Sequence, residues 1–308
     1  MELEVTLNQL AHQTQIATSA TSDDQFIATW LSLKHSQHTR RAYERVVDLL
    51  LDYLEEMPAD IRSAKIETVA GFLELPRFDA DSPGTKAQRC AIVKSLFSFG
   101  QKTGYIGFNV AAAIPPPKQQ NRKTERLMSE GDVVRLIDAA GSAKGQNAKN
   151  DRNRLIVRLL YMAGLRVSEV SNLKWKHIMD RDNNALQLTV HGKGGKTRHV
   201  LLPANFAEAL RAWRGAGLED EFVFQSNSGG RLSERSIQAM VKSAAERTNF
   251  GKPVSPHWLR HAHASHALDR GATLAVVQET LGHSDISTTG AYLHAKPGDG
   301  SAMYLPEA

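Results

Sequence analysis

Apolar residues recur at helical spacing in four segments of the first third of the chain, each giving one apolar face. The first predicted helix begins at Asp23, and the second follows the turn H-S-Q-H-T-R-R. The third covers Ile66–Leu75, and the fourth covers residues 85–102, before Gly104. Four amphipathic helices in a row are typical of a small bundle. The pattern predicts an all-helical domain over residues 23–113, preceded by a flexible arm over residues 1–22, where periodicity is weak.

A proline-rich stretch interrupts this helical pattern. The sequence A-A-A-I-P-P-P-K-Q-Q-N-R-K-T-E-R places three consecutive prolines among polar and basic residues. Proline lacks the amide hydrogen that a helix interior needs, and proline-rich segments are stiff and extended. Residues 114–125 are therefore predicted to be an exposed linker and a domain boundary.

The rest of the chain mixes two periodicities. Helical spacing follows Ser129, runs from about Asp151 to Gly164, and returns after Ser233. Between these helices A-L-Q-L-T-V-H alternates apolar and polar residues, G-K-G-G-K-T-R turns the chain, and H-V-L-L-P returns it, which is the pattern of a β-hairpin. Phe222 to Phe224 is a candidate third strand. We predict a mainly α chain whose second domain holds a small antiparallel β-sheet, an α+β arrangement.

Two short helices near the end of the chain carry chemically useful side chains. Ser255 and Pro256 are a helix-start signal, and Gly271 is a stop. A second helix fits Thr273 to Leu281 and ends at Gly282. The imidazole of His257 and the guanidinium of Arg260 lie on one face of the first helix, where both can point at one small anion. His283 follows the second helix, and Tyr292 comes nine residues later.

Composition and charge narrow the function classes. The 308 residues are 41% hydrophobic with a mean hydropathy of -0.36, and neither a membrane-length apolar run nor a signal-peptide pattern is present, so we expect a cytosolic protein. Cys90 is the single cysteine, which excludes an intramolecular disulfide and predicts a buried thiol. Residues 1–120 carry 12 basic and 14 acidic residues, whereas residues 121–308 carry 26 and 19. The basic part suits a phosphate backbone, although it also suits other surfaces.

Taken together, these motifs resemble the tyrosine recombinase (phage integrase-like) family. The carboxy-terminal signature is H-x-x-R at His257 and Arg260, then L-G-H ending at His283, then Tyr292. Upstream, G-L-R-V-S-E holds Arg166 and Glu169, and the hairpin tip reads G-K-G-G-K-T-R. In the first domain, S-x-x-T-x-x-x-Y at Ser36, Thr39 and Tyr43 and T-x-x-x-R at Thr85 and Arg89 resemble the family's core-binding domain.

The resemblance implies a role for each of these residues. Its catalytic set maps onto Arg166, Lys193, His257, Arg260, His283 and Tyr292. Tyr292 would be the nucleophile and Lys193 the general acid, with Lys196 as the alternative lysine, and Glu169 would orient the site without touching the phosphate. The candidates for DNA-backbone contact are Thr39, Arg40, Arg41, Lys86, Arg89, Lys196, Arg235 and Lys242, and an ordinary solvated basic face is the competing interpretation.

The residue types fit transfer of a DNA phosphodiester. Arginine offers a planar, permanently charged donor fork to phosphate oxygens. A tyrosine has a pKa near 10, so only about one phenol in a thousand is ionised at pH 7 and the site must assist it. A phosphotyrosyl intermediate keeps the ester energy, so rejoining needs no ATP and no metal. The sequence contains no P-loop motif and no two-metal carboxylate cluster. Four histidines lie between His257 and His266, but the cysteines or glutamate that would complete a metal site are missing. We therefore expect no cofactor and no metal.

The resemblance also implies the larger organisation. Residues 126–295 would form the catalytic domain, and residues 296–308 a tail. The two domains would close as a C-shaped clamp on double-stranded DNA, without a membrane partner. The active assembly would be a homo-tetramer, or a hetero-tetramer with a paralogous recombinase, on two DNA sites in the nucleoid.

Several functions remain open at the level of sequence. The short first segment favours the Xer-type recombinases that resolve chromosome dimers over larger integrases. A recombinase of a mobile element, a single-cut DNA topoisomerase, and a DNA-binding protein of the same fold that does not cut are the alternatives. The target DNA sequence depends on side-chain geometry that sequence patterns do not reveal.

Overall fold

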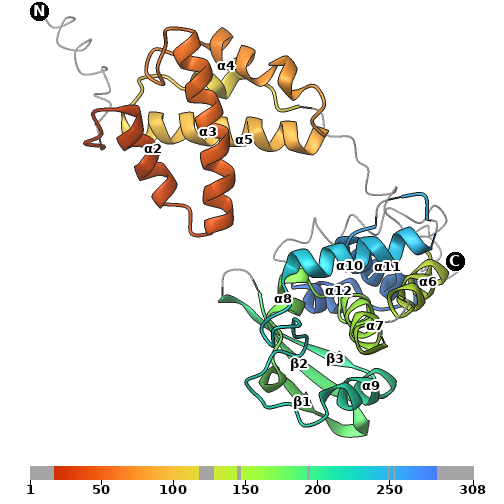
Figure 1. Ribbon diagram of the computed structural model, residues 1–308. Coiled ribbons are helices and arrows are strands. Elements are labelled where there is room, and N and C mark those ends of the chain that lie inside the picture. The colour runs from red at the N-terminus through yellow and green to blue at the C-terminus, as the bar shows by residue number, and fades with distance from the viewer. Residues whose placement is uncertain are drawn as a thin grey trace, which may run out of the picture. The chain divides into compact units, whose positions relative to one another are not determined.

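The computed structural model describes residues 17–117, 128–143, 147–192, 195–248, 250–252 and 254–282. The chain divides into two compact units, Met1–Asn121 and Arg122–Ala308 (Figure 1). None of the described helices is both long enough and apolar enough to span a bilayer. The fold is mainly helical with one small antiparallel sheet, as the sequence predicts.

The first unit is built from helices around an aromatic core. Its elements are α2 (Asp23–Ser32), α3 (Gln37–Glu56), α4 (Ile66–Leu73) and α5 (Pro83–Thr103), with 3-10 turns at Pro76–Phe78 and Val110–Ala113. Ser22, Ser36 and Ser82 cap α2, α3 and α5 through their hydroxyl groups. The third helix ends two residues earlier than predicted because Pro76 begins a 3-10 turn there.

The second unit holds seven described α-helices and the sheet (Figure 1). The helices are α6 (Glu130–Ala140), α7 (Asn147–Met162), α8 (Val167–Ser171), α9 (Ala204–Arg214), α10 (Glu234–Arg247), α11 (Pro256–Asp269) and α12 (Leu274–Leu281). Ser129 and Asp132 form a reciprocal capping box at α6, as their spacing predicts. Thr273 caps α12, and Gly282 ends it in the left-handed conformation.

The sheet has the order β1-β2-β3, from Ile178–Asp180, Leu186–His191 and Thr197–Leu202, and all pairs are antiparallel. In this register Leu188 lies opposite both Ile178 and Val200. The hairpin prediction is confirmed, but the predicted strand at Phe222–Phe224 is wrong. Phe222 makes only an isolated bridge to Lys174, and the third strand is instead β1. Three residues are too short for alternation to reveal a strand in sequence.

Helices and sheet share one core, which fixes the elements around the site. The apolar face of β2 and β3 packs with α9 and the neighbouring helices through Leu188, Val200, Phe206 and Leu210. Helices α6, α7, α10 and α11 pack against one another, and α12 packs on both α11 and β3. The start of α8, the start of α11, the end of α12 and strand β3 are thereby held in one region (Figure 1).

Candidate active site

The turn between α7 and α8 presents Arg166. Gly164, near the start of this turn, has a φ of 57°, a left-handed conformation that suits glycine. The Glu169 carboxylate accepts a hydrogen bond from the Arg166 backbone amide at 2.8 Å and another from its Nη1 at 3.0 Å. The side chain of Arg166 is 39% exposed, so it reaches solvent while Glu169 holds its base. This geometry orients a guanidinium toward an external ligand.

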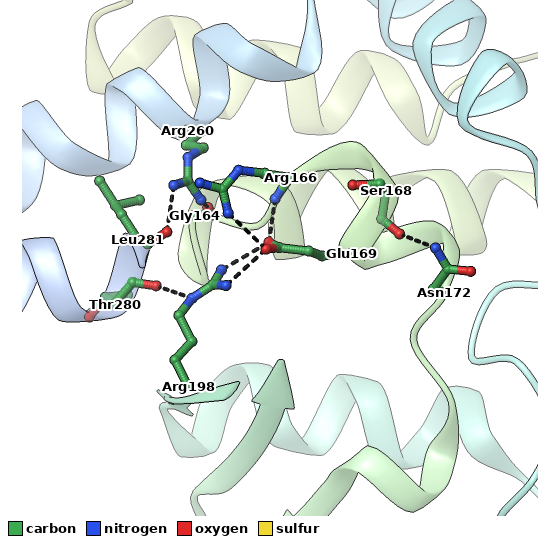
Figure 2. Close-up of polar contacts among 9 residues, drawn as sticks. All are labelled: Gly164, Arg166, Ser168, Glu169, Asn172, Arg198, Arg260, Thr280 and Leu281. Atoms are coloured by element: carbon green, nitrogen blue, oxygen red, sulfur yellow. Dashed lines mark hydrogen bonds and ion pairs between the residues drawn. The ribbon is translucent and has the colours of Figure 1, made fainter. Parts of the chain in front are cut away.

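Glu169 binds a second arginine that the sequence interpretation gave no role. Both terminal nitrogens of Arg198, on β3, donate to the Glu169 carboxylate at 2.8 and 2.9 Å (Figure 2). The side chains of Arg198 and Glu169 are only 9% and 4% exposed. The signal for Arg198 was its place in the G-K-G-G-K-T-R motif, but nothing in that motif reveals a partner in α8.

The charge on Glu169 is set by a competition. Burial raises the pKa of this carboxyl, but the hydrogen bonds from Arg198 and from the Arg166 amide, with both positive charges, outweigh burial and hold its pKa below the ordinary value. Glu169 is therefore a carboxylate at neutral pH. It acts as a fixed acceptor for two guanidinium groups.

Arg260 lies in the interior between two backbone carbonyls. Its side chain comes from the first turns of α11, and the residue is 4% exposed. One terminal nitrogen donates to the carbonyl of Gly164 and the other to the carbonyl of Leu281, in the last turn of α12 (Figure 2). The guanidinium therefore joins the α7–α8 turn to the end of α12, beside Arg166.

His257 lies one turn before Arg260 and is exposed. Its Nε2 shares a hydrogen bond of 2.8 Å with Nε2 of His261, so one ring donates and the other accepts. Pro256 occupies the first turn of α11, as predicted, but Ser255 makes no side-chain cap, contrary to the prediction for that residue. The exposed imidazole thus stands at the start of α11, where helix amides favour anions.

One pocket collects these groups. Arg166, His257 and Arg260 line a depression of about 510 Å³ together with Lys242 and Gln238 from α10. Among the described residues, the guanidinium groups of Arg166 and Arg198 both bind the Glu169 carboxylate, and Arg260 lies beside Arg166 (Figure 2). An anion such as a phosphate would offset the remaining positive charge. Lys193, His283 and Tyr292, the other members of the expected set, lie outside the described residues.

The candidate DNA contacts in the second unit are on its surface. Lys242 lines the pocket, and Arg235 lies seven residues earlier on the same face of α10, exposed. Lys196 is exposed at the tip of the hairpin, where its carbonyl accepts a hydrogen bond of 2.7 Å from Gly192. These placements leave the three side chains accessible to a ligand.

The first unit separates its candidates into two groups. Arg40 and Arg41 are exposed at the start of α3, and Thr39 and Lys86 are half-buried. Arg89 is buried, forms an ion pair with Asp81, and stacks its guanidinium 3.3 Å from the ring centre of Phe78. The structure therefore places Arg89 inside the unit, against a direct contact with DNA. The T-x-x-x-R spacing could not reveal this because Phe78 and Asp81 precede the helix.

The remaining histidines of α11 make internal contacts. His266 hydrogen-bonds the Tyr161 hydroxyl at 2.9 Å and the Met128 carbonyl at 2.8 Å. Among the described residues, no three His, Cys, Asp or Glu side chains come together as metal ligands. Cys90 is buried, as predicted, and burial raises the pKa of its thiol.

Comparison with known proteins identifies the family. Residues 23–104 match the N-terminal SAM-like domain of phage integrases, and residues 126–298 match the phage integrase family. The chain is 34% identical over 262 residues to tyrosine recombinase XerC of Xanthomonas campestris pv. campestris, which covers 84% of this chain and 79% of that protein.

Solved structures share the fold. The XerH site-specific recombinase bound to its difH substrate in a pre-cleavage complex matches with a TM-score of 0.71 at 19% identity, over 98% of this chain and 87% of that chain. A lambda integrase tetramer bound to a Holliday junction matches with a TM-score of 0.71 at 18% identity, over 90% and 78%.

The chain therefore belongs to the phage integrase family. Within that family it is a Xer-type site-specific tyrosine recombinase, an enzyme that cuts and rejoins DNA strands.

Proposed function

We propose that this enzyme resolves chromosome dimers by exchanging strands between two copies of one chromosomal site. The observation that supports a phosphodiester site is the convergence of Arg166, His257 and Arg260 on one pocket. The similarity to XerC proteins favours a housekeeping role over the mobility of a genetic element.

The proposed chemistry assigns one task to each side chain. The Tyr292 oxygen attacks the scissile phosphorus while His257 or His283 accepts the phenol proton. The bond to the 5′ oxygen breaks, and that oxygen takes a proton from Lys193, leaving a 3′-phosphotyrosyl bond. Arg166 and Arg260 offer donors to the phosphate oxygens, whose charge grows during attack. Reversal with a new 5′ hydroxyl rejoins the strand.

The domain roles belong to the same proposal. Residues 23–113 would bind the core of the site, residues 114–125 would link the units, and residues 126–295 would carry the chemistry, so that the two units close on the duplex as a clamp. The family matches over residues 23–104 and 126–298 support this division. We further propose a tetramer on two DNA sites in the nucleoid, made of identical subunits or including a paralogue.

The decisive experiment isolates DNA that is covalently attached to the protein in its own cells, after religation has been blocked. Wild-type adducts mapping to one chromosomal locus, and absent from Tyr292→Phe, are the expected result, because phenylalanine has no oxygen to attack phosphorus. Adducts at the ends of mobile elements would contradict the chromosomal role. Equal adducts from the Tyr292→Phe variant would contradict the nucleophile.

A further inference from the structure

Two arginines bind the last turn of α12. Arg260 donates to the carbonyl of Leu281, and Nε of Arg198 donates to the carbonyl of Thr280 at 2.7 Å (Figure 2). The last carbonyls of a helix lack partners within the helix, so they accept readily from cationic donors. The point from which the chain continues toward His283 and Tyr292 is therefore held by two guanidinium groups.

Arg198 uses its whole guanidinium in this network. Nε binds Thr280, and the two terminal nitrogens bind the Glu169 carboxylate, whose other hydrogen bonds go to Arg166. One side chain thus joins three segments: strand β3, the start of α8, and the end of α12. Lysine could not make the same contacts because an ammonium group is a point charge without a planar fork.

Close packing supports the same connection. Gly282, which follows α12, has a φ of 63°, and a Cβ at this position would lie 3.0 Å from Cδ of Arg198. A side chain at position 282 would therefore crowd the stem of Arg198, whose Nε is hydrogen-bonded to the carbonyl of Thr280. The end of α12 thus lies close against this residue of β3.

We propose that Arg198 is a positioning residue for strand cleavage. It holds the Glu169 carboxylate that orients Arg166, and it holds the end of α12 from which the chain leads to the nucleophile. It acts through these groups rather than by touching the phosphate, since its three nitrogens are already engaged within the protein. The inference rests on the proposed roles of Arg166 and Tyr292.

The test measures single-turnover formation of the covalent adduct on a nicked substrate, with saturating protein, for Arg198→Lys. We expect a rate about 10- to 100-fold below wild type, because small misplacements of reacting groups have effects of this size. Binding to uncut DNA should stay within about twofold, because the charge is kept. Arg211→Lys is the control: Arg211, on α9, likewise binds a carboxylate, Asp180, and the carbonyl of Asn184, and none of these three residues contacts Glu169 or α12 in the hydrogen bonds described above.

A modified substrate separates the proposal from its main rival. Lys193 precedes Arg198 by five residues in the sequence, so the rival explanation of an Arg198→Lys defect is displacement of the proposed general acid. A substrate with sulfur in place of the bridging 5′ oxygen releases a thiolate, which needs no proton because thiols have a pKa near 8.5. We expect the Arg198→Lys defect to persist on this substrate. Restoration of the wild-type rate would overturn the proposal in favour of an effect on Lys193.

A double variant tests the route through Glu169. If Arg198 acts partly by holding that carboxylate, Arg198→Lys combined with Glu169→Gln should be slowed by less than the product of the two single effects. Independent multiplication would overturn this route, and so would an Arg198→Lys rate within about twofold of wild type. Wild-type cleavage and its loss in Tyr292→Phe, measured in the same assay, test the proposed nucleophile separately.

Discussion

At the scale of single residues, Glu169 is a buried carboxylate whose negative charge is balanced by two arginines. A carboxylate removed from water is costly unless donors replace the lost hydration, and here Arg198 and Arg166 supply four hydrogen bonds. The same carboxylate lies between the positive charges of Arg166 and Arg198 and offsets their mutual repulsion. Its contribution to stability must therefore depend on its ionisation.

Glu169→Gln is expected to lower the free energy of unfolding at pH 7 by about 3 kcal/mol, the usual effect of breaking one partner of a buried ion pair. Because the folded-state pKa of Glu169 lies below the ordinary value, its stabilisation is complete above about pH 4.3 and is lost as pH falls through the folded pKa. Urea unfolding of both proteins at pH 7 and near pH 3 measures this. A difference that stays constant between the two pH values would show that the carboxylate charge is not the stabilising factor.

Individual site residues differ in how far sequence could place them. The spacing of His257 and Arg260 predicted one shared face, and the structure brings both to the pocket that Arg166 lines. Sequence could not show that Arg198 belongs with them, because Glu169 lies 29 residues away and Thr280 lies 82 residues away. Nor could it show that Arg89 is buried. A basic residue is usually exposed unless an acidic partner accompanies it into the interior, and the sequence does not reveal that Asp81 is this partner.

At the scale of elements, the end of α12 depends on a glycine for two separate reasons. Gly282 needs a left-handed backbone, and its missing side chain leaves room for Arg198. Gly271, which follows α11, also has a left-handed φ of 88°, but nothing lies within 4 Å of a Cβ there. Comparing alanine substitutions at the two glycines therefore separates the cost of the left-handed backbone from the cost of displacing Arg198.

Gly282→Ala is expected to destabilise the protein by more than Gly271→Ala, and to slow adduct formation, because only the first displaces Arg198. The backbone cost shared by both is about 1 kcal/mol, the penalty for an L-residue in the left-handed region. Thermal unfolding and single-turnover cleavage of the two variants measure the difference. Equal effects on both assays would mean that the contact with Arg198 has no consequence.

Elements with local signals were predicted well, and those defined by distant contacts were not. Caps at Ser129 and Thr273 and the alternation of β2 carry their own evidence in sequence. Strand β1 exists because its three residues pair with β2, and α9 was not predicted at all. In the apolar run at Phe222–Phe224, Val223 and Phe224 are buried and Phe222 makes only an isolated bridge, so hydrophobicity alone misidentified this run as a strand.

At the scale of the whole molecule, the two units have separate hydrophobic cores. The buried cluster of the first unit runs from Phe26 to Ala111, and that of the second from Met128 to Ala262. A unit with its own core has what it needs to fold alone. The proline-rich sequence between the clusters is where the composition predicted a boundary.

We expect fragments 1–121 and 122–308, produced separately, each to unfold cooperatively, because cutting there removes no residue from either core. Circular dichroism melting of each fragment, compared with the intact protein, measures this. A fragment that shows no cooperative transition would mean that contacts between the units supply a necessary part of its stability.

The hydrogen bond from Arg260 to Leu281 has a thermodynamic consequence beyond geometry. The guanidinium that lines the anion pocket is also hydrogen-bonded to the last turn of α12, so an anion in the pocket and this hydrogen bond use the same donor group. Any coupling between them is reciprocal: the factor by which a bound anion changes the stability of the Arg260–Leu281 hydrogen bond is the factor by which that bond changes the affinity for the anion. A displacement of the last turn of α12 and the binding of a phosphate are then linked by a single coupling free energy.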